Sequence, residues 1–186
     1  IKTFGSNSDA NYSYKLINLT NKRSYFNFFK GKKILFKNLS TNLLGEHNVQ
    51  NLTAVLSIIN DLGYKIKKSH ILSFKGTKRR MNILGKLKKT IFIDDYAHHP
   101  TEIEKLIKVI SLYKKKNVCL IIEPHRYSRL NDLYVEYLSV LKNVKNLIIL
   151  KTYEAGESYK KGMKNSKNLV NDLNVLNNQK TKYVDN

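Results

Sequence analysis

The chain has 186 residues, 41% of them apolar, which suffices for one ordinary domain, or for one small domain with part of another, and excludes a disordered chain. Its formal net charge of +20 would attract nucleic acid or an anionic membrane surface. Because the lysines recur along the whole chain without one dense block, a solvated basic surface is favoured over specific binding to nucleic acid.

The first part of the chain predicts a strand meander followed by two helices. Residues 11–20, 23–29 and 32–39 are short segments rich in β-branched and aromatic side chains, separated by Asn, Lys and Gly. A helix is predicted next, because apolar residues recur at helical spacing: Val49, Leu52, Leu56 and Ile59. A shorter helix is expected over residues 67–74. The polar, glycine-containing junction that follows places a domain boundary between residues 73 and 74.

Beyond this junction, strands alternate with helices. Short apolar runs at 91–94, 118–122 and 147–150 predict strands. Helices are expected between them, the first beginning with Pro100, Thr101 and Glu102, and a further helix and a short strand are expected at 168–176 and 182–184. This alternation predicts an α/β fold with a parallel sheet.

Polar and charged residues follow the predicted strands. Because the carboxyl ends of parallel strands meet at one edge, we expect one cleft to be lined by the loop 153–157 and by Asp95, His98, His125, Arg126 and Arg129. Two arginines three residues apart suit a carboxylate or phosphate, although a surface ion-pair cluster is an equal alternative on composition alone. Adjacent His98 and His99 do not predict a metal site, since no further ligand spacing supports one.

A polar stripe is expected at the start of the first helix. It consists of His47, Asn48 and Asn51. Asn48 would suit a helix cap, whereas Asn51 lies one turn further on and would suit either a ligand contact or a buried amide. The phosphate-binding motif Gly-x-x-x-x-Gly-Lys-Ser/Thr does not occur in the sequence, so any nucleotide site here is incomplete.

The remaining sequence signals concern the compartment. Cys119 is the only cysteine of the sequence, so an internal disulfide is excluded. Its place in an apolar run predicts a buried, reduced thiol. No stretch approaches the roughly 20 apolar residues that span a membrane, and a signal-peptide pattern is missing at Ile1, which favours a cytoplasmic protein. Because the first residue is not Met, we expect the chain to be a piece of a longer protein.

Five segments in order resemble the successive motifs of the Mur ligase family, in particular of its alanine-adding member. They are residues 45–51 (GEHNVQN), 74–80 (FKGTKRR), 94–102 (DDYAHHPTE), 124–129 (PHRYSR) and 153–157 (YEAGE). The resemblance implies that residues 1–73 form the last part of a central ATPase domain. Residues 74–186 would then form a carboxyl-terminal Rossmann-like domain with flanking helices, lacking its final strand region.

The resemblance also implies roles for individual residues. His47, Asn48 and Asn51 would lie beside the adenine of ATP, and Arg80 and Asp95 would reach its phosphates and ribose. The amino acid L-alanine and the new amide would be surrounded by Tyr96, His98, His125, Arg126 and Arg129. Arg80, His98 and His125 would be the catalytic residues.

The implied reaction is ATP-dependent amide formation in peptidoglycan precursor synthesis, with L-alanine, UDP-N-acetylmuramate, ATP and Mg²⁺ as participants. The muramyl carboxylate is phosphorylated, and the amine then attacks the acyl phosphate. The magnesium ligands and the phosphate loop are expected upstream, so the chain alone is expected to be inactive. Two alternatives stay open: a murein-tripeptide recycling ligase of the same family, suggested by Glu123-Pro124, and a basic nucleic-acid-binding module.

Overall fold

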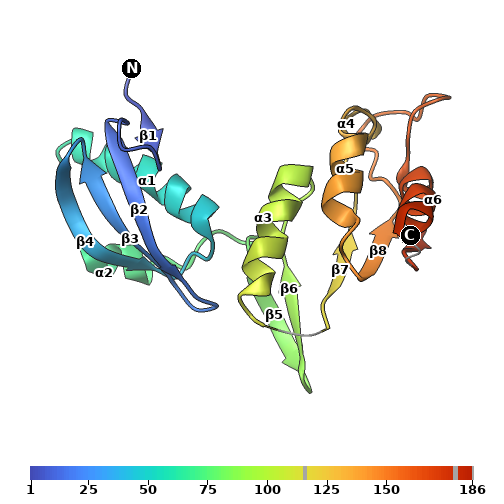
Figure 1. The fold of residues 1–186 in the computed structure, drawn as a ribbon, viewed down its shortest axis with the longest axis horizontal. Coiled ribbons are helices and arrows are strands. Elements are labelled where there is room, and N and C mark those ends of the chain that lie inside the picture. Colours follow the sequence, from blue (N-terminus) through green and yellow to red (C-terminus); the bar gives the residue numbers. More distant parts are fainter. Residues whose placement is uncertain (115–116, 178–179, 186) are drawn as a thin grey trace. The chain divides into compact units, whose positions relative to one another are not determined.

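The computed structural model describes residues 1–114, 117–177 and 180–185, and the chain divides into two compact units (Figure 1). The first unit contains residues 1–95 and 107–114, and the second contains residues 96–106 and 115–186. The helix α3 (Pro100–Ser111) contributes residues to both.

The first unit is built on a four-stranded sheet with the order β1-β2-β3-β4. The first pair is parallel, and the other pairs are antiparallel, joined by short turns. This arrangement confirms the predicted meander. The strands are β1 (Phe4–Gly5), β2 (Tyr12–Leu19), β3 (Ser24–Lys30) and β4 (Lys33–Thr41).

Two helices cover this sheet, as the apolar spacing predicts. They are α1 (Glu46–Asp61), which packs on β1, β2 and β3, and α2 (Lys68–Ser73), which packs on β4. Helix α1 starts after Gly45, whose φ of 90° lies in the region that favours glycine. The buried side chains that join helices and sheet include Tyr12, Phe26, Phe28, Leu39, Val49, Leu56 and Ile71.

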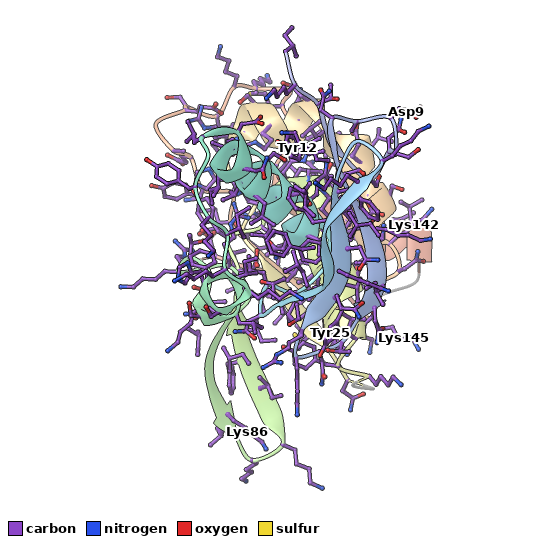
Figure 2. All side chains as sticks on the ribbon, turned by 90° about the vertical axis from the view of Figure 1, so that its left-hand side faces the viewer. Asp9, Tyr12, Tyr25, Lys86, Lys142 and Lys145 are labelled. Atoms are coloured by element: carbon purple, nitrogen blue, oxygen red, sulfur yellow. The ribbon has the colours of Figure 1, made fainter. Side chains whose placement is uncertain are left out.

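A β-hairpin, β5 (Asn82–Leu87) with β6 (Thr90–Asp94), completes the strands of this unit. Figure 2 shows Lys86 near the tip of the hairpin. The sequence predicts β6 but places it in a parallel sheet, which is wrong: β6 pairs antiparallel with β5. The strand β5 is missed because Gly85 and polar neighbours interrupt its apolar pattern, and the register shifts at that point.

The second unit contains the predicted parallel sheet, with the order β7-β8-β9. These strands are β7 (Cys119–Ile122), β8 (Asn146–Leu150) and β9 (Lys182–Val184). The accompanying helices are α4 (Tyr127–Asp132), α5 (Tyr134–Leu141) and α6 (Ser166–Asn177), and α6 packs on α5 and on the sheet. The α/β class and the alternation of strands and helices are therefore confirmed.

The predicted environment of the cysteine is wrong. Cys119 is exposed. The prediction assumes a strand covered on both faces, as in the middle of a parallel sheet. In the three-stranded sheet, however, β7 is an edge strand, and Ile121 on it is also 59% exposed.

Candidate active site

Four aromatic side chains of the second unit meet beside the carboxyl ends of β7 and β8. His125 follows β7, and its ring centroid lies 4.7 Å from that of Tyr153, which follows β8. Backbone bridging between these two residues continues the parallel pairing beyond the strands. The His98 ring lies 5.1 Å from His125, and Tyr96 lies 4.9 Å from His98. The structure thus brings together three of the predicted site residues and Tyr153, which belongs to the loop 153–157 that is expected at the cleft.

The loop that carries His98 is held in place by hydrogen bonds on several sides. Nδ1 of His98 lies 2.8 Å from the carbonyl oxygen of Tyr96, so the tautomer with its proton on Nδ1 satisfies that oxygen and leaves Nε2 as an acceptor. The Glu102 carboxylate accepts the backbone N–H groups of His98 and His99 at 3.2 and 3.3 Å. The Tyr137 hydroxyl donates to the His98 carbonyl. The imidazole therefore has little freedom to move.

His125 is arranged to stay neutral. Burial lowers its pKa from the ordinary value of 6.5, and the nearby His98 and Arg129 lower it further. The Arg129 guanidinium donates to the backbone carbonyl of His125 at 3.3 Å. A neutral imidazole can accept a proton from a bound ammonium group, so this pair of histidines suits acid–base chemistry.

Arg126 and Arg129 place two cations next to the histidines. Arg126 has φ 71° and ψ 134°, a backbone conformation that residues other than glycine rarely adopt. Its N–H donates to the Tyr153 carbonyl at 2.8 Å, and its side chain remains 51% exposed. Guanidinium groups with free faces bind carboxylates through paired hydrogen bonds. The site can therefore hold the carboxylate of a small acid beside a proton acceptor.

The predicted nucleotide residues belong to the first unit. Asn48 is not the cap of α1, since Gly45 occupies that position; the Asn48 side-chain amide instead donates to the Leu44 carbonyl at 2.7 Å. Asn51 is exposed and His47 is half-buried, both in the first turns of the helix. Of the two interpretations of Asn51, a ligand contact or a buried structural amide, the second is therefore wrong.

In this unit, Asp95 is linked to the segment that carries Arg80 by a hydrogen bond to the backbone. Asp95 Oδ2 accepts the N–H of Met81 at 2.8 Å, and Met81 directly follows Arg80. The neighbouring pair, Arg79 and Asp94, forms an ion pair at 3.5 Å. These contacts join the segment before β5 to the end of β6, so the two predicted residues are held on one local framework.

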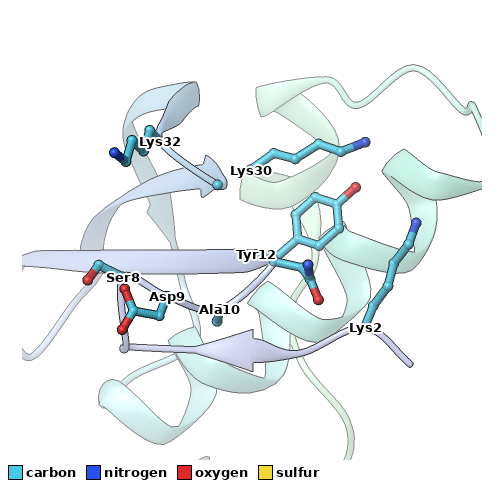
Figure 3. A pocket seen from close by; sticks show the side chains of 9 residues that line it. Lys2, Ser8, Asp9, Ala10, Tyr12, Lys30 and Lys32 are labelled. Atoms are coloured by element: carbon cyan, nitrogen blue, oxygen red, sulfur yellow. The ribbon is translucent and has the colours of Figure 1, made fainter.

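A pocket of about 510 Å³ lies elsewhere in the first unit. Figure 3 shows Lys2, Lys30 and Lys32 among its lining side chains. Two of these lysines are ion-paired with Asp61, Lys2 at 2.6 Å and Lys30 at 3.6 Å. The pocket includes none of the predicted site residues.

Two further searches concern metals and membranes. Within residues 1–114, 117–177 and 180–185, no group of three or more His, Cys, Asp or Glu side chains is arranged to hold a metal ion. Over the same described ranges, every helix is too short or too polar to cross a bilayer.

Several residues that shape the site are missed by the sequence. The sequence places Tyr137 on the apolar face of a predicted helix. It does not predict the hydrogen bond between the Tyr137 hydroxyl and the His98 loop. For Glu102, the sequence predicts only a favourable negative charge in the first turn of α3. Tyr153 and Glu157, by contrast, lie in the loop 153–157 directly after β8, which the sequence predicts to line the cleft.

The family model of the Mur ligase, glutamate ligase domain matches residues 79–186. The curated UDP-N-acetylmuramate–L-alanine ligase of Pelagibacter ubique is 36% identical over 167 residues, which are 86% of this chain and 36% of the relative. The ligase of the same name from Carboxydothermus hydrogenoformans is 36% identical over 128 residues, 68% of this chain and 28% of the relative. The chain therefore spans about a third of the length of these relatives.

Solved structures share the fold. The UDP-N-acetylmuramate-alanine ligase MurC from Thermotoga maritima has a TM-score of 0.79 at 23% identity, over 100% of this chain and 39% of that chain. MurF from Acinetobacter baumannii has a TM-score of 0.68 at 19% identity, over 98% of this chain and 37% of that chain. At such identities the likeness concerns the fold alone, whereas the family model covers more than half of the sequence. The chain belongs to the Mur ligase family.

Proposed function

We propose that the chain is part of an ATP-dependent ligase that joins L-alanine to UDP-N-acetylmuramate in peptidoglycan precursor synthesis, acting in the cytoplasm. The observation that carries this proposal is the convergence of His98, His125, Arg126 and Arg129 at the carboxyl ends of parallel strands, in a chain whose curated relatives bear that ligase name. Mur ligases are ATP-dependent enzymes, and this arrangement supplies what the second half of their reaction needs.

In the proposed mechanism, the arginines hold the L-alanine carboxylate and the histidines receive a proton. The muramyl carboxylate first takes the terminal phosphoryl group of ATP, which leaves ADP and an acyl phosphate. A neutral His125 accepts a proton from the alanine ammonium, and the freed amine attacks the acyl carbon. The new C–N bond forms, the C–O bond to phosphate breaks, and the departing phosphate takes the second proton of the attacking nitrogen, which leaves the neutral amide. Tyr96 and Tyr153 border the His125 ring.

We assign the nucleotide side of the reaction to the first unit. His47, Asn48 and Asn51 would contact the adenine, and Arg80 and Asp95 would contact the phosphates and ribose. The polar start of α1 and the Asp95–Met81 hydrogen bond support this assignment, because both lie in the first unit and present polar groups. In this proposal residues 1–73 belong to the central ATPase domain and residues 74–186 to the carboxyl-terminal domain. Mg²⁺ would be bound by residues outside this chain.

The two alternatives receive less support. The curated relatives from Pelagibacter ubique and Carboxydothermus hydrogenoformans carry the alanine-ligase name rather than that of a tripeptide ligase. A nucleic-acid-binding module would leave the convergent histidines without a purpose, since phosphate contacts need only lysines and arginines.

A chimeric enzyme tests the proposal. The present chain replaces the aligned region of the Pelagibacter ubique ligase, and phosphate release from ATP is measured with UDP-N-acetylmuramate and each of several amino acids. We expect release that requires L-alanine, with the unaltered relative as the positive control. A chimera that binds ATP but prefers glutamate or a tripeptide over L-alanine would contradict the proposed substrate.

A further inference from the structure

Glu157 reaches from the loop after β8 to the start of α4. One carboxylate oxygen accepts the backbone N–H of Ser128 at 2.9 Å, and the other accepts the Ser128 hydroxyl at 2.6 Å. The second oxygen also lies 4.0 Å from Nη1 of Arg126. These contacts lower the pKa of Glu157, chiefly through the hydrogen bonds from Ser128, so the carboxylate is charged at neutral pH.

The loop is shaped to aim this carboxylate. Ala155 and Gly156 both have positive φ angles, 50° and 85°, and the Glu157 N–H donates back to the Glu154 carbonyl at 3.0 Å. A positive φ is unfavourable for alanine, so the contacts made by the turn must maintain it. The turn is therefore a defined structure that returns Glu157 toward the site.

Arg126 also has a positive φ, 71°, and both its backbone and its side chain approach the loop after β8. Its backbone N–H donates to the Tyr153 carbonyl, while the Tyr153 N–H donates to the Pro124 carbonyl, each at 2.8 Å. The backbone is thus fixed by the loop after β8, whereas the half-exposed side chain has Glu157 as its acidic neighbour. A guanidinium has five N–H donors, so one acidic neighbour leaves donors for a second carboxylate.

We propose that Glu157 is a positioning residue that holds the Arg126 guanidinium beside the His98–His125 pair and thereby sets the affinity for the carboxylate of the amino-acid substrate. The inference rests on the proposed function for the identity of that substrate. Its physical basis is preorganisation: a long, half-exposed side chain loses conformational entropy when it binds a ligand, and a fixed acidic neighbour reduces that loss in advance.

Glu154 offers a matched control in the same turn. Its carboxylate accepts the Tyr127 hydroxyl at 3.4 Å, whereas Glu157 contacts Ser128 and Arg126. Replacing either glutamate by glutamine removes one negative charge from the same loop and leaves its length unchanged. A difference between the two variants therefore reports the contact with Arg126 and Ser128, not the net charge.

The experiment uses nuclear magnetic resonance of the chain, with the wild type and the variants Glu157→Gln, Glu157→Ala and Glu154→Gln. The order of the Arg126 side chain is measured from its Nε–Hε signal, and L-alanine is titrated as the probe. We expect Glu157→Gln to reduce the order of Arg126 and to weaken L-alanine binding about 2- to 5-fold, the range of a partly exposed ion pair. Glu157→Ala should weaken binding further, because Ser128 also loses its acceptor. Glu154→Gln should match the wild type.

The two readouts separate this inference from the proposed function. If Glu157→Gln leaves the Arg126 signal and the L-alanine affinity the same as Glu154→Gln does, the positioning role is overturned. If the wild-type chain does not bind L-alanine, the proposed function fails, and the Arg126 signal still reports whether Glu157 orders the guanidinium. Thermal unfolding of each variant, measured in parallel, identifies a loss of binding that is caused by unfolding.

Discussion

The proposed proton transfer depends on His125, whose imidazole must be neutral to accept a proton. Its pKa is lowered by burial and by the neighbouring His98 and Arg129. Lowering a histidine pKa means that the unfolded chain binds more protons than the folded chain between the two pKa values. The free energy of unfolding must therefore rise with pH in that window and stop rising above the ordinary value of 6.5.

This sign gives a testable pH dependence. In urea unfolding between about pH 5 and pH 8, we expect the wild type to be less stable on the acid side, and His125→Gln to show a smaller dependence on pH. The variant removes the group whose proton uptake favours the unfolded chain. An unchanged slope in His125→Gln would mean that His125 titrates as it does in the unfolded chain.

Arg129 is expected to distinguish the two substrates of the proposed enzyme. In the chimeric ligase, Arg129→Ala should raise the KM for L-alanine far more than the KM for ATP, because a lost charge-assisted hydrogen bond costs about 1.5–3 kcal/mol. Steady-state kinetics with each substrate varied measures this difference. Arg23→Ala, in a surface turn of the first unit, serves as the control. Equal effects on both KM values would contradict a role in holding the amino acid.

The residues of the site differ in how well the sequence predicts them. His125 and Arg129 can be predicted to lie beside Tyr153, because these residues follow the parallel strands β7 and β8, whose carboxyl ends meet at one edge. His98 follows β6, which pairs antiparallel with β5, so its place beside His125 does not follow from that rule. Glu157 and Tyr137 act on other residues through single hydroxyl or carboxylate contacts, and no local pattern encodes those contacts. Cys119 is mispredicted because its exposure depends on the order of strands in the sheet and not on its neighbours in the sequence.

At the scale of elements, α5 supports the loop that leads into α3. Tyr137 on α5 is fully buried, and burial raises the pKa of its hydroxyl to about 12, which keeps it a hydrogen-bond donor at neutral pH. The acceptor is the carbonyl of His98, in the loop 96–99. One helix of the unit therefore fixes the position of a catalytic candidate that it does not carry.

Tyr137→Phe tests this support. We expect a loss of about 0.5–1.5 kcal/mol in the free energy of unfolding, since a single hydrogen bond is removed with little change in packing. Tyr134→Phe is the matched control on the same helix, because its hydroxyl bonds to Asp172 at 2.7 Å and not to the loop. Only Tyr137→Phe should shift the resonances of the His98 ring. Equal shifts in both variants would show that the loop is held by other contacts.

The sequence predicts most elements but not all strand pairings. The helices α1, α3 and α5 follow from apolar residues at helical spacing, and the starts of α1 and α3 follow from Gly45 and Pro100. The pairing of β6 cannot be predicted in this way, because the sequence of a short apolar strand does not indicate whether its neighbour is parallel or antiparallel. Its partner β5 is fully exposed, and an exposed strand lacks the alternation that identifies a half-buried one.

For the whole molecule, charge and family lead to different expectations. A net charge of +20 attracts anions of any kind, and such attraction weakens steeply with salt and carries little selectivity. In the proposed function the site in the second unit would be selective by contrast, because its imidazole and guanidinium groups would bind one carboxylate and one amine in a defined geometry. We therefore attribute the net charge to a solvated surface, and we assign the proposed activity to the convergent loops.

The central claim is that the loops after β7 and β8, with the loop before α3, form an amino-acid site. The most direct measurement is titration of the chain with L-alanine while the ring signals of its histidines are followed by nuclear magnetic resonance. The account predicts saturable shifts of His98 and His125, no comparable shift of His70 in α2, and loss of the effect in Arg129→Ala. Equal shifts of all three rings, or saturable shifts that persist unchanged in Arg129→Ala, would contradict it.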